Sequence, residues 1–420
     1  MQNELQISQR GIDMPQSPIR KLAPLAYKAE DEGVKIYRLN IGQPDLPTPQ
    51  KALDVLSKID RNTLEYSPSQ GYRSLRQALV GYYERYQIKL NADEIIITSG
   101  GSEAVLFAFM SCLNPGDEII VPEPAYANYM SFAISAGAVI RTVTTTIDEG
   151  FCLPKVEKFE ELINERTKAI LICNPNNPTG YLYSQKEMNQ IRDLVKKYNL
   201  YLFSDEVYRE FIYTGSPYIS AMHLEGIEQN VVLIDSVSKR YSECGIRIGA
   251  LITKNEAVRK TVMKFCQARL SPPLIGHQVS FEASIEGTEA YSREVYEEYT
   301  ERRKCLIDGV NRIPGCYTPI PMGAFYTVAK LPVNDAEKFC AWCLSDFRYK
   351  DETTDTLKPS GTKGLPVTGE TIMMAPAAGF YTDPSLGKNQ VRLAYVLCKE
   401  DLQRALMILE KAIEEYNKLL

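Results

Sequence analysis

Short apolar runs alternate with amphipathic stretches through the middle of the 420-residue chain. The runs predict strands at Glu94–Ser99, Asp117–Pro122, Ala138–Val143, Lys168–Cys173, Tyr201–Asp205, Val231–Asp235 and Gly249–Thr253, and the stretches between them predict helices at Ser102–Leu113 and Gln185–Tyr198. Strands that alternate with helices indicate crossover units and a mostly parallel sheet with both faces covered. We therefore expect a doubly wound α/β fold here.

The pattern changes after about Glu286. A charged helical stretch over 291–307 and a helix over 336–347 lead to a final strand over 391–397 and a helix over 401–420. We predict a large domain over residues 46–288, and a smaller α/β domain built from both chain ends, 1–45 and 289–420, with an N-terminal arm. Residues 351–370 lack apolar periodicity and predict a long loop.

Composition excludes several classes of protein. The apolar fraction of 44% and the charged fraction of 24% are ordinary for a soluble globular protein. The net charge of -5 favours neither a nucleic acid nor an anionic membrane as partner. The polar N-terminal residues lack the apolar core of a signal peptide, and no apolar run is long enough to cross a bilayer. The ten scattered cysteines indicate reduced thiols and a cytoplasmic protein.

Metal, redox and histidine chemistry are disfavoured. Cys340 and Cys343 have the spacing of a redox motif, but they fall within an expected helix that no thioredoxin-like strand precedes. The chain has only two histidines, His223 and His277, and neither lies near a second cluster of metal ligands. We therefore expect no metal site and look for a lysine as the general base.

Four of the expected strands end in polar residues. These are Gly100–Ser102, Asn174–Gly180, Asp205 with Tyr208 one turn later, and Ser236 with Ser238 and Lys239. Ligands of such sheets bind at the carboxyl ends of the strands. We expect these donors, the acid, the phenol and the amine to share one site.

Lys239 is the central residue of this site. A lysine at the end of a strand, inside a pocket, can be desolvated enough to react as an amine. Ser236, Ser238 and Arg247 supply hydroxyls and a guanidinium that suit a phosphate dianion. The glycine turn at Gly101 opens a helix whose free N–H groups favour an anion. Together they describe a phosphate site beside a lysine, which is what pyridoxal phosphate needs.

Asp205, Asn177 and Tyr208 complete the set. A carboxylate beside the pyridine nitrogen of that cofactor would keep the nitrogen protonated, so that the ring can accept electrons. Tyr208 and Asn177 can donate to the phenolate oxygen of the ring. Taken singly, each residue also fits an ordinary role: Asp205 as a helix cap, Asn177 in a turn and Lys239 on the surface.

The ordered set of motifs resembles the class I aminotransferases of fold type I. The resemblance is carried by Asn174–Gly180, Ser204–Tyr208, Ser236–Lys239 and Gly245–Gly249, and further by Leu39–Pro44, Tyr66–Leu75, Thr98–Ala104, Asp117–Tyr126 and Val391–Tyr395. It covers nearly the whole chain in the order of the family.

The resemblance implies pyridoxal phosphate as cofactor and a role for each matching residue. Lys239 would form the Schiff base and then carry the proton between the substrate carbon and the cofactor carbon. Asp205 would pair with the pyridine nitrogen, Asn177 and Tyr208 would bind the phenolate oxygen, and Tyr126 would stack on the ring. The expected catalytic residues are Lys239, Asp205 and Tyr208.

The phosphate and the substrate have their own expected ligands. The phosphate would be held by Gly101, Ser102, Ser236, Ser238 and Arg247. Tyr66 resembles a tyrosine that reaches the phosphate of the neighbouring subunit, which implies a homodimer with shared sites. Arg392 would bind the α-carboxylate of the substrate, with Gly42 and Asn177 beside it.

Two departures from the family concern specificity. In some aspartate-specific relatives a lysine follows the paired glycines and binds the distal carboxylate, whereas this chain has Ser102. Arg20, Lys21 and Arg269 are candidates to replace it. The loop over 351–370 is longer than is usual in the family, and we hypothesise that it lies near the mouth of the pocket and affects substrate choice.

The expected activity is transamination from an L-amino acid, aspartate or an aromatic one, to a 2-oxo acid such as 2-oxoglutarate by a ping-pong mechanism. A pyridoxal-phosphate C–S β-lyase on the same scaffold is the alternative, because it would use the same lysine and phosphate site. A regulator without activity is disfavoured, because the reactive set is intact and no DNA-binding segment precedes residue 40.

Overall fold

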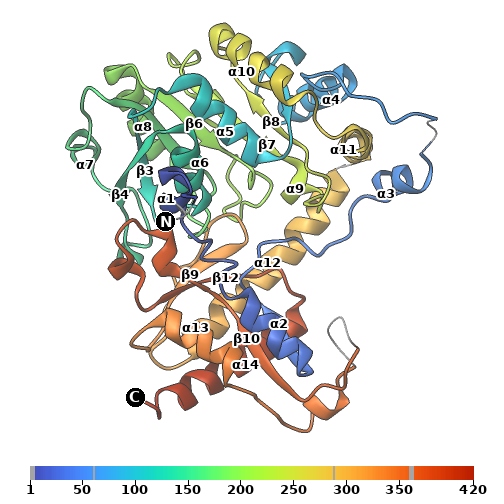
Figure 1. Ribbon diagram of the computed structural model, residues 1–420, viewed down its shortest axis with the longest axis vertical. Coiled ribbons are helices and arrows are strands. Elements are labelled where there is room, and N and C mark those ends of the chain that lie inside the picture. Colours follow the sequence, from blue (N-terminus) through green and yellow to red (C-terminus); the bar gives the residue numbers. More distant parts are fainter. Residues whose placement is uncertain (1–4, 60–61, 287–288, 359–363) are drawn as a thin grey trace.

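A seven-stranded sheet forms the centre of the larger part of the molecule (Figure 1). The computed structural model describes residues 5–59, 62–286, 289–358 and 364–420. The strand order is β2-β8-β7-β6-β5-β3-β4, and only β8 runs antiparallel to its neighbours. The strands are β2 (Ile95–Thr98), β3 (Glu118–Glu123), β4 (Val139–Thr144), β5 (Thr167–Cys173), β6 (Tyr201–Asp205), β7 (Val231–Ser236) and β8 (Gly249–Ile252). This confirms the mostly parallel α/β sheet.

Helices cover both faces of this sheet. Neighbouring residues of its strands point to opposite sides, so each strand contributes buried side chains to both faces. Phe203 of β6 belongs to the apolar cluster that includes residues of α5 (Gly101–Cys112), α6 (Asn128–Ala136) and α10 (Glu256–Arg269), whereas Leu202 belongs to the separate cluster that includes residues of α8 (Gln185–Tyr198). The face of β2 and β8 is covered by α3 (Gln50–Ser57), α4 (Arg73–Glu84) and α11 (Leu274–Glu286). The sheet is therefore doubly wound.

Two smaller sheets lie in the other part of the molecule. β1 (Val34–Arg38) pairs in parallel with β10 (Gly369–Met373), and β12 (Gln390–Ala394) lies between β11 (Ala375–Pro376) and β9 (Tyr326–Lys330). Their helices are α2 (Ala23–Asp31), α13 (Ala336–Ser345) and α14 (Lys399–Tyr416). Segments from both chain ends thus lie side by side, while the boundaries at residues 46 and 288 stay a prediction.

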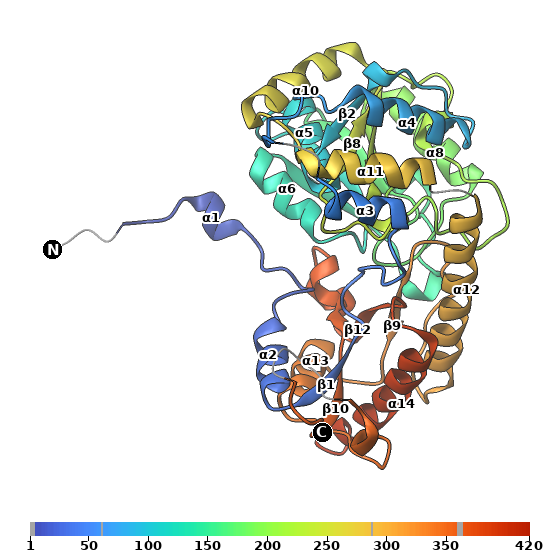
Figure 2. The same cartoon turned by 90° about the vertical axis from the view of Figure 1, so that its right-hand side faces the viewer.

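Two helices extend from these layers (Figure 2). α12 (Glu289–Arg312) runs along the side of the molecule from the larger part to the smaller one. α1 (Gln9–Asp13) projects away from the body and buries none of its residues. Within the described ranges, no helix is long and apolar enough to cross a membrane.

Candidate active site

The carboxyl ends of the central strands meet the loop that follows β1, and Lys239 lies at this meeting point. β7 ends at Ser236, whose hydroxyl caps the one-turn helix α9 (Val237–Arg240) by accepting from the Ser238 amide. Lys239 Nζ donates to the carbonyl of Gly42 at 2.8 Å, and it lies 3.8 Å from Cys244 Sγ. The lysine therefore reaches from the large sheet to the segment after β1.

Asp205 ends β6 as a buried carboxylate, 7% exposed. It accepts from the Tyr129 hydroxyl at 2.6 Å and from the Val207 amide at 3.3 Å. Burial raises the pKa of Asp205 to about 6, against the hydrogen bonds from Tyr129 and Val207, which lower it. Among the described residues no cation pairs with Asp205, so a protonated pyridine nitrogen would fit beside it.

Arg392 is a buried guanidinium in the middle of β12, 1% exposed. Nη1 donates to Asn177 Oδ1 at 3.0 Å, Nη2 donates to the carbonyl of Asn40, and Nε has no partner. The guanidinium also lies over the ring of Tyr326, 4.5 Å from the centroid. No carboxylate of the described residues pairs with it, which is the state expected of an arginine that binds an anionic substrate group.

Asn177 and Tyr208 join this arginine to Lys239 through a chain of polar contacts. Asn177 Nδ2 donates to the Tyr208 hydroxyl at 3.4 Å, and the Tyr208 hydroxyl lies 3.1 Å from that of Tyr326. The Tyr326 hydroxyl in turn donates to the Gly42 carbonyl at 3.5 Å, the same oxygen that Lys239 contacts. Asn177 and Tyr208 are both buried, so their donors face a site with little water.

A cradle for an anion lies at the start of α5. Gly100 has φ +77°, and a Cβ there would lie 2.3 Å from Arg247 Nη2, so the guanidinium lies directly over this turn. A Cβ on Gly101 would lie 3.7 Å from Cβ of Ser236, whose hydroxyl donates to that of Ser238 at 2.8 Å. Free N–H groups of the helix start and a cation make this cradle suit a phosphate. Ser102 lies in the first turn of the same helix.

Tyr126 follows β3 and lies half-buried beside Asp205. Its hydroxyl accepts from Asn128 Nδ2 at 2.8 Å, and its ring meets that of Tyr129 edge-on at 5.3 Å. Burial raises the pKa of Tyr126 to about 12, and Asp205 and Arg392 are both near enough to affect it. A ring at this place can pack against a flat cofactor held above Asp205.

Tyr66 is the one predicted site residue that the fold does not bring to this centre. It lies in the loop before α4 with 76% of its surface exposed. The prediction assigned it to the site of a neighbouring subunit, and this role stays a prediction. All the other predicted residues lie around Lys239, Asp205, the start of α5 or Arg392.

Three residues of the centre were missed by sequence reasoning. Tyr129 bonds Asp205, Tyr326 bonds Tyr208, and Asn40 bonds Arg392. A Cβ on Gly42 would lie 1.6 Å from the Tyr326 hydroxyl, so glycine is required for this close approach. The one available signal was the motif Leu39–Pro44, which contains Asn40 and Gly42.

The prediction that the loop over 351–370 lies near the mouth of the pocket is wrong for its described parts, 351–358 and 364–370, whereas an effect on substrate choice stays a prediction. The Thr368 amide donates to the Gly33 carbonyl at 3.0 Å, so the loop enters β10 beside the start of β1. Asn40 and Gly42 follow the other end of β1, about 16 Å away along a five-residue strand. Arg404 of α14 fixes the loop at its far side through Asp351, at 2.7 Å. Residues 359–363 lie outside the described part of the chain.

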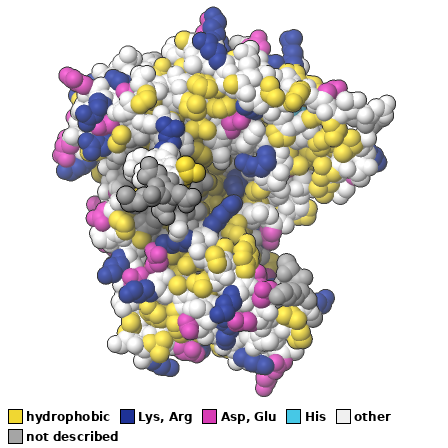
Figure 3. Space-filling model, in the orientation of Figure 1, with side chains coloured by type: hydrophobic (Ala, Val, Ile, Leu, Met, Phe, Trp, Pro, Cys, Tyr) yellow, Lys and Arg dark blue, Asp and Glu magenta, His cyan; other side chains and the backbone are white. Residues whose placement is uncertain are grey.

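The surface around the site carries positive charge. Figure 3 shows Lys and Arg side chains along the hollow between the two parts of the molecule.

Within the described ranges, no group of three or more His, Cys, Asp or Glu side chains could hold a metal ion. The chemistry of the site is thus that of an amine, a buried carboxylate, a buried guanidinium and an anion cradle.

Comparison with known proteins gives one consistent family. The family model described as "Aminotransferase class I and II" matches residues 34–349. Aspartate aminotransferase from Pyrococcus horikoshii is 30% identical, over 97% of both chains, and aspartate aminotransferase from Thermotoga maritima is 30% identical over 81% of this chain and 89% of its own. The solved structure of aspartate aminotransferase from Thermus thermophilus with maleate superposes with a TM-score of 0.84 at 26% identity, over 97% of this chain and all of the other. The two have the same fold.

Proposed function

The chain belongs to the class I and II aminotransferases, which carry out transamination with pyridoxal phosphate, and we propose that the residues around Lys239 perform this reaction on an L-amino acid and a 2-oxo acid. The first pair to test is aspartate with 2-oxoglutarate, followed by an aromatic amino acid. Support comes from the names of relatives, which include aspartate aminotransferases and an aromatic-amino-acid aminotransferase from Thermococcus litoralis.

One observation carries the proposal. Two buried charged side chains, Asp205 and Arg392, have no ion-pair partner of opposite charge among the described residues. The amine of Lys239 lies between the central sheet and the segment after β1. An uncompensated buried charge is costly, so it persists where a ligand supplies the partner. A cationic ring nitrogen and a substrate carboxylate are the two missing charges.

Pyridoxal phosphate, when bound, supplies the carbonyl that takes up amino groups and the ring that accepts electrons. Asp205 would hold the ring nitrogen in its protonated form. Asn177 and Tyr208 would donate to the phenolate oxygen, and Tyr126 would pack on the ring face. Gly101, Ser102, Ser236, Ser238 and Arg247 would hold the phosphate.

The residues around the substrate have separate tasks. Arg392, whose Nε has no partner, would bind the α-carboxylate, with Asn177 and Gly42 beside it. This contact would place the substrate Cα next to Lys239. The Nζ of Lys239 would take the proton from that carbon and carry it to the cofactor carbon. Such a positioned base accelerates proton transfer by about 10²- to 10⁴-fold. The burial of Asn177, Tyr208 and Arg392 excludes competing water.

The Asp205→Asn variant tests the role of Asp205 in the cofactor-free protein. Since burial raises the pKa of Asp205 to about 6 from the ordinary 3.8, the folded state binds its proton more tightly than the unfolded state does. This tighter proton binding stabilises the folded state below pH 4, and the stabilisation is lost as the pH rises through 6. We expect the variant to be more stable than the parent at pH 8 by roughly 1–3 kcal/mol, and this gain to vanish near pH 4, by urea unfolding.

Asp235→Asn is the matched control on the neighbouring strand. Asp235 is also buried, but it pairs with Arg240 at 2.6 Å. Burial raises its pKa, but the nearby charges of Arg240 and Arg209 outweigh this effect, so the pKa of Asp235 is lowered. Its replacement should destabilise the protein at pH 8. Equal stability of the Asp205→Asn variant and the parent at both pH values would contradict the account of Asp205. In the cofactor-bound form, Asp205→Asn should also lower the rate of transamination.

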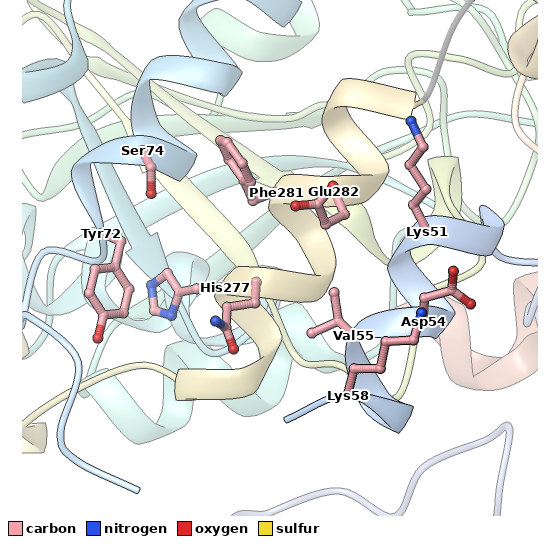
Figure 4. A pocket seen from close by; sticks show the side chains of 10 residues that line it. Lys51, Asp54, Val55, Lys58, Tyr72, Ser74, His277, Phe281 and Glu282 are labelled. Atoms are coloured by element: carbon pink, nitrogen blue, oxygen red, sulfur yellow. The ribbon is translucent and has the colours of Figure 1, made fainter. Parts of the chain in front are cut away.

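We further propose a homodimer in which Tyr66 reaches the phosphate of the partner's site. The segment around Tyr66 exposes apolar side chains, with Leu56 at 47% and Leu64 at 71%. A groove between α3 and α11 lies close by, and Figure 4 shows Val55 and Phe281 among its residues. Exposed apolar surface of this kind is typical of subunit interfaces.

The Leu64→Glu variant tests this interface. Because Leu64 is largely exposed, the glutamate should leave the folded subunit intact and weaken only the association. We expect sedimentation velocity to show a shift from dimer to monomer. The activity should fall in parallel, since each site would lose the Tyr66 that the other subunit contributes. Leu420→Glu, at a comparably exposed leucine of the C-terminus, is the control. An active monomer would refute the shared site.

A C–S β-lyase remains the second candidate, and it is not favoured, because the relatives are named as aminotransferases. We also propose a cytoplasmic location, supported by ten cysteines that are all free thiols in the structure. The division into domains at 46–288 and at 1–45 with 289–420 is likewise our proposal, supported by the pairing of β1 with β10.

A further inference from the structure

The helix that carries Lys239 is only one turn long, so the rest of the fold must set its orientation. α9 contains four residues, and Ser236 caps its start by accepting from the Ser238 amide at 3.2 Å. A first helical turn is unfavourable by itself, because several residues are fixed for one hydrogen bond. The contacts of Lys239 Nζ with the Gly42 carbonyl and Cys244 Sγ lie at the far end of a flexible side chain.

One buried carboxylate binds both ends of this helix. Asp235, the residue before Ser236, is 1% exposed. Its Oδ1 accepts from the Ser236 amide at 2.8 Å, and its Oδ2 accepts from Arg240 Nη2 at 2.6 Å. Ser236 is the cap at the start of α9, and Arg240 is the last residue of the helix. The carboxylate of Asp235 therefore spans the turn in which Lys239 lies.

Two tyrosines of α4 hold the carboxylate and the guanidinium in place. The hydroxyl of Tyr83, a fully buried residue, donates to Asp235 Oδ2 at 2.7 Å. The Arg240 guanidinium lies over the ring of Tyr82, 4.1 Å from the centroid. A planar guanidinium that is both stacked and paired is fixed in its orientation. The end of α9 is thus attached to a packed helix of the large domain.

The direction of Arg240 constrains the direction of Lys239. Successive residues of a helix point about 100° apart, so a residue held toward α4 turns its neighbour to another side. Arg240 faces the buried tyrosines, and Lys239 faces the Gly42 carbonyl. A buried ion pair adds little net stability, because removing both charges from water costs about as much as their attraction returns. The orientation of the turn is then the main contribution of the pair.

We propose that the ion pair of Asp235 and Arg240 positions Lys239, by turning α9 so that the amine points into the site and not along the sheet. The pair is buried and acts on the reaction only through Lys239, so both are positioning residues. A reacting group that is misplaced by about 1 Å can slow a reaction about 10²-fold. The inference rests on the proposed function, in which Lys239 holds the cofactor.

The Arg240→Met variant tests the pair in the cofactor-loaded enzyme. We expect kcat with aspartate and 2-oxoglutarate to fall about 10- to 100-fold, while KM for aspartate changes less than about threefold, because Arg392 keeps its contacts. Arg240→Lys retains a cation for Asp235 and should recover part of kcat. Arg404→Met is the matched control. It also removes an arginine that pairs with a buried carboxylate, that of Glu370 in the smaller sheets, and it should leave kcat unchanged.

A second measurement does not depend on turnover. Cofactor-free protein is mixed with pyridoxal phosphate, and the covalent attachment to Lys239 is followed by absorbance and, after borohydride reduction, by mass spectrometry of the Lys239 peptide. The rate of attachment should fall about tenfold or more in Arg240→Met. Pyridoxamine phosphate has an amine in place of the carbonyl and cannot attach. Its dissociation constant should change less than about threefold, since the anion cradle does not include Arg240.

Tyr83→Phe is a milder variant that removes one hydrogen bond from Asp235 with little change in volume. It should lower kcat and the rate of attachment about two- to fivefold, and it replaces Arg240→Met in the test if that variant does not fold.

Unchanged kcat and an unchanged rate of attachment in the tested variant would overturn the inference. Equal changes in kcat, in KM and in the dissociation constant of pyridoxamine phosphate would also overturn it, because they would show general damage to the site. A parent protein in which pyridoxal phosphate does not attach to Lys239 would refute the proposed function instead.

Discussion

Replacing Lys239 with alanine is expected to abolish measurable transamination, a fall of at least about 10³-fold. The reason is the position of this amine: Lys239 Nζ is held 2.8 Å from the Gly42 carbonyl, between the segment after β1 and the central sheet. The variant should also lack the absorbance of the covalently bound cofactor. Stopped assays with aspartate and 2-oxoglutarate, and the absorption spectrum of the purified protein, measure the two effects.

Controls separate the amine of Lys239 from its structural contacts. The Lys239→Ala variant should keep its fold, and should still bind pyridoxal phosphate without a covalent bond, because the cradle of Gly101, Ser236 and Arg247 is intact. A small primary amine added to the assay should restore part of the proton transfer. Transamination by the variant within about tenfold of the parent rate would show that another group is the base.

The Arg392→Met variant is expected to lower kcat/KM for every amino donor by about 10²- to 10³-fold. Arg392 is 1% exposed and has no carboxylate partner among the described residues, so the substrate would be the partner of its charge. Losing a buried, hydrogen-bonded charge pair costs on the order of 3–4 kcal/mol, which corresponds to this range. Kinetics with aspartate and phenylalanine measure it.

The pattern across donors tests whether Arg392 binds a group that all amino acids share. The loss in Arg392→Met should be similar for both donors, because every amino acid has an α-carboxylate. Arg404→Met is the control: Arg404 pairs with Asp351 and Glu370 at the far side of the smaller sheets, so its loss should reduce stability without changing the ratio between donors. An Arg392→Met variant with unaltered kcat/KM would show that Arg392 does not bind the α-carboxylate of the substrate.

The central sheet could be predicted well from the sequence, because strands buried on both faces need continuous apolar runs. The run over 201–205 coincides with β6, and the run over 231–235 falls one residue short of β7. The smaller sheets were harder to predict. Their strands β1, β9 and β10 were not identified. In β1 and β10 charged residues interrupt the pattern: Glu370 of β10 is fully buried, and its charge is balanced by Arg404 from a distant helix.

The site divides in the same way. Lys239, Asp205 and Asn177 could be located because polar residues at the ends of parallel strands must converge. Tyr326, in contrast, enters the site only because β9 and the loop after β1 come together, with its hydroxyl 3.1 Å from that of Tyr208. The position of the loop over 351–370 depends on the parallel pairing of β1 with β10, and neither strand shows its partner in its own sequence.

The most direct test of the account is a single half-reaction. The cofactor-loaded enzyme is mixed with L-aspartate, without a 2-oxo acid, and the products are followed together with the absorption spectrum. We predict one equivalent of oxaloacetate per site, full conversion of the cofactor to its amine form, no ammonia, and return of the original spectrum when 2-oxoglutarate is added. Release of ammonia beyond one equivalent per site, in the absence of any acceptor, would contradict transamination and indicate an eliminating enzyme.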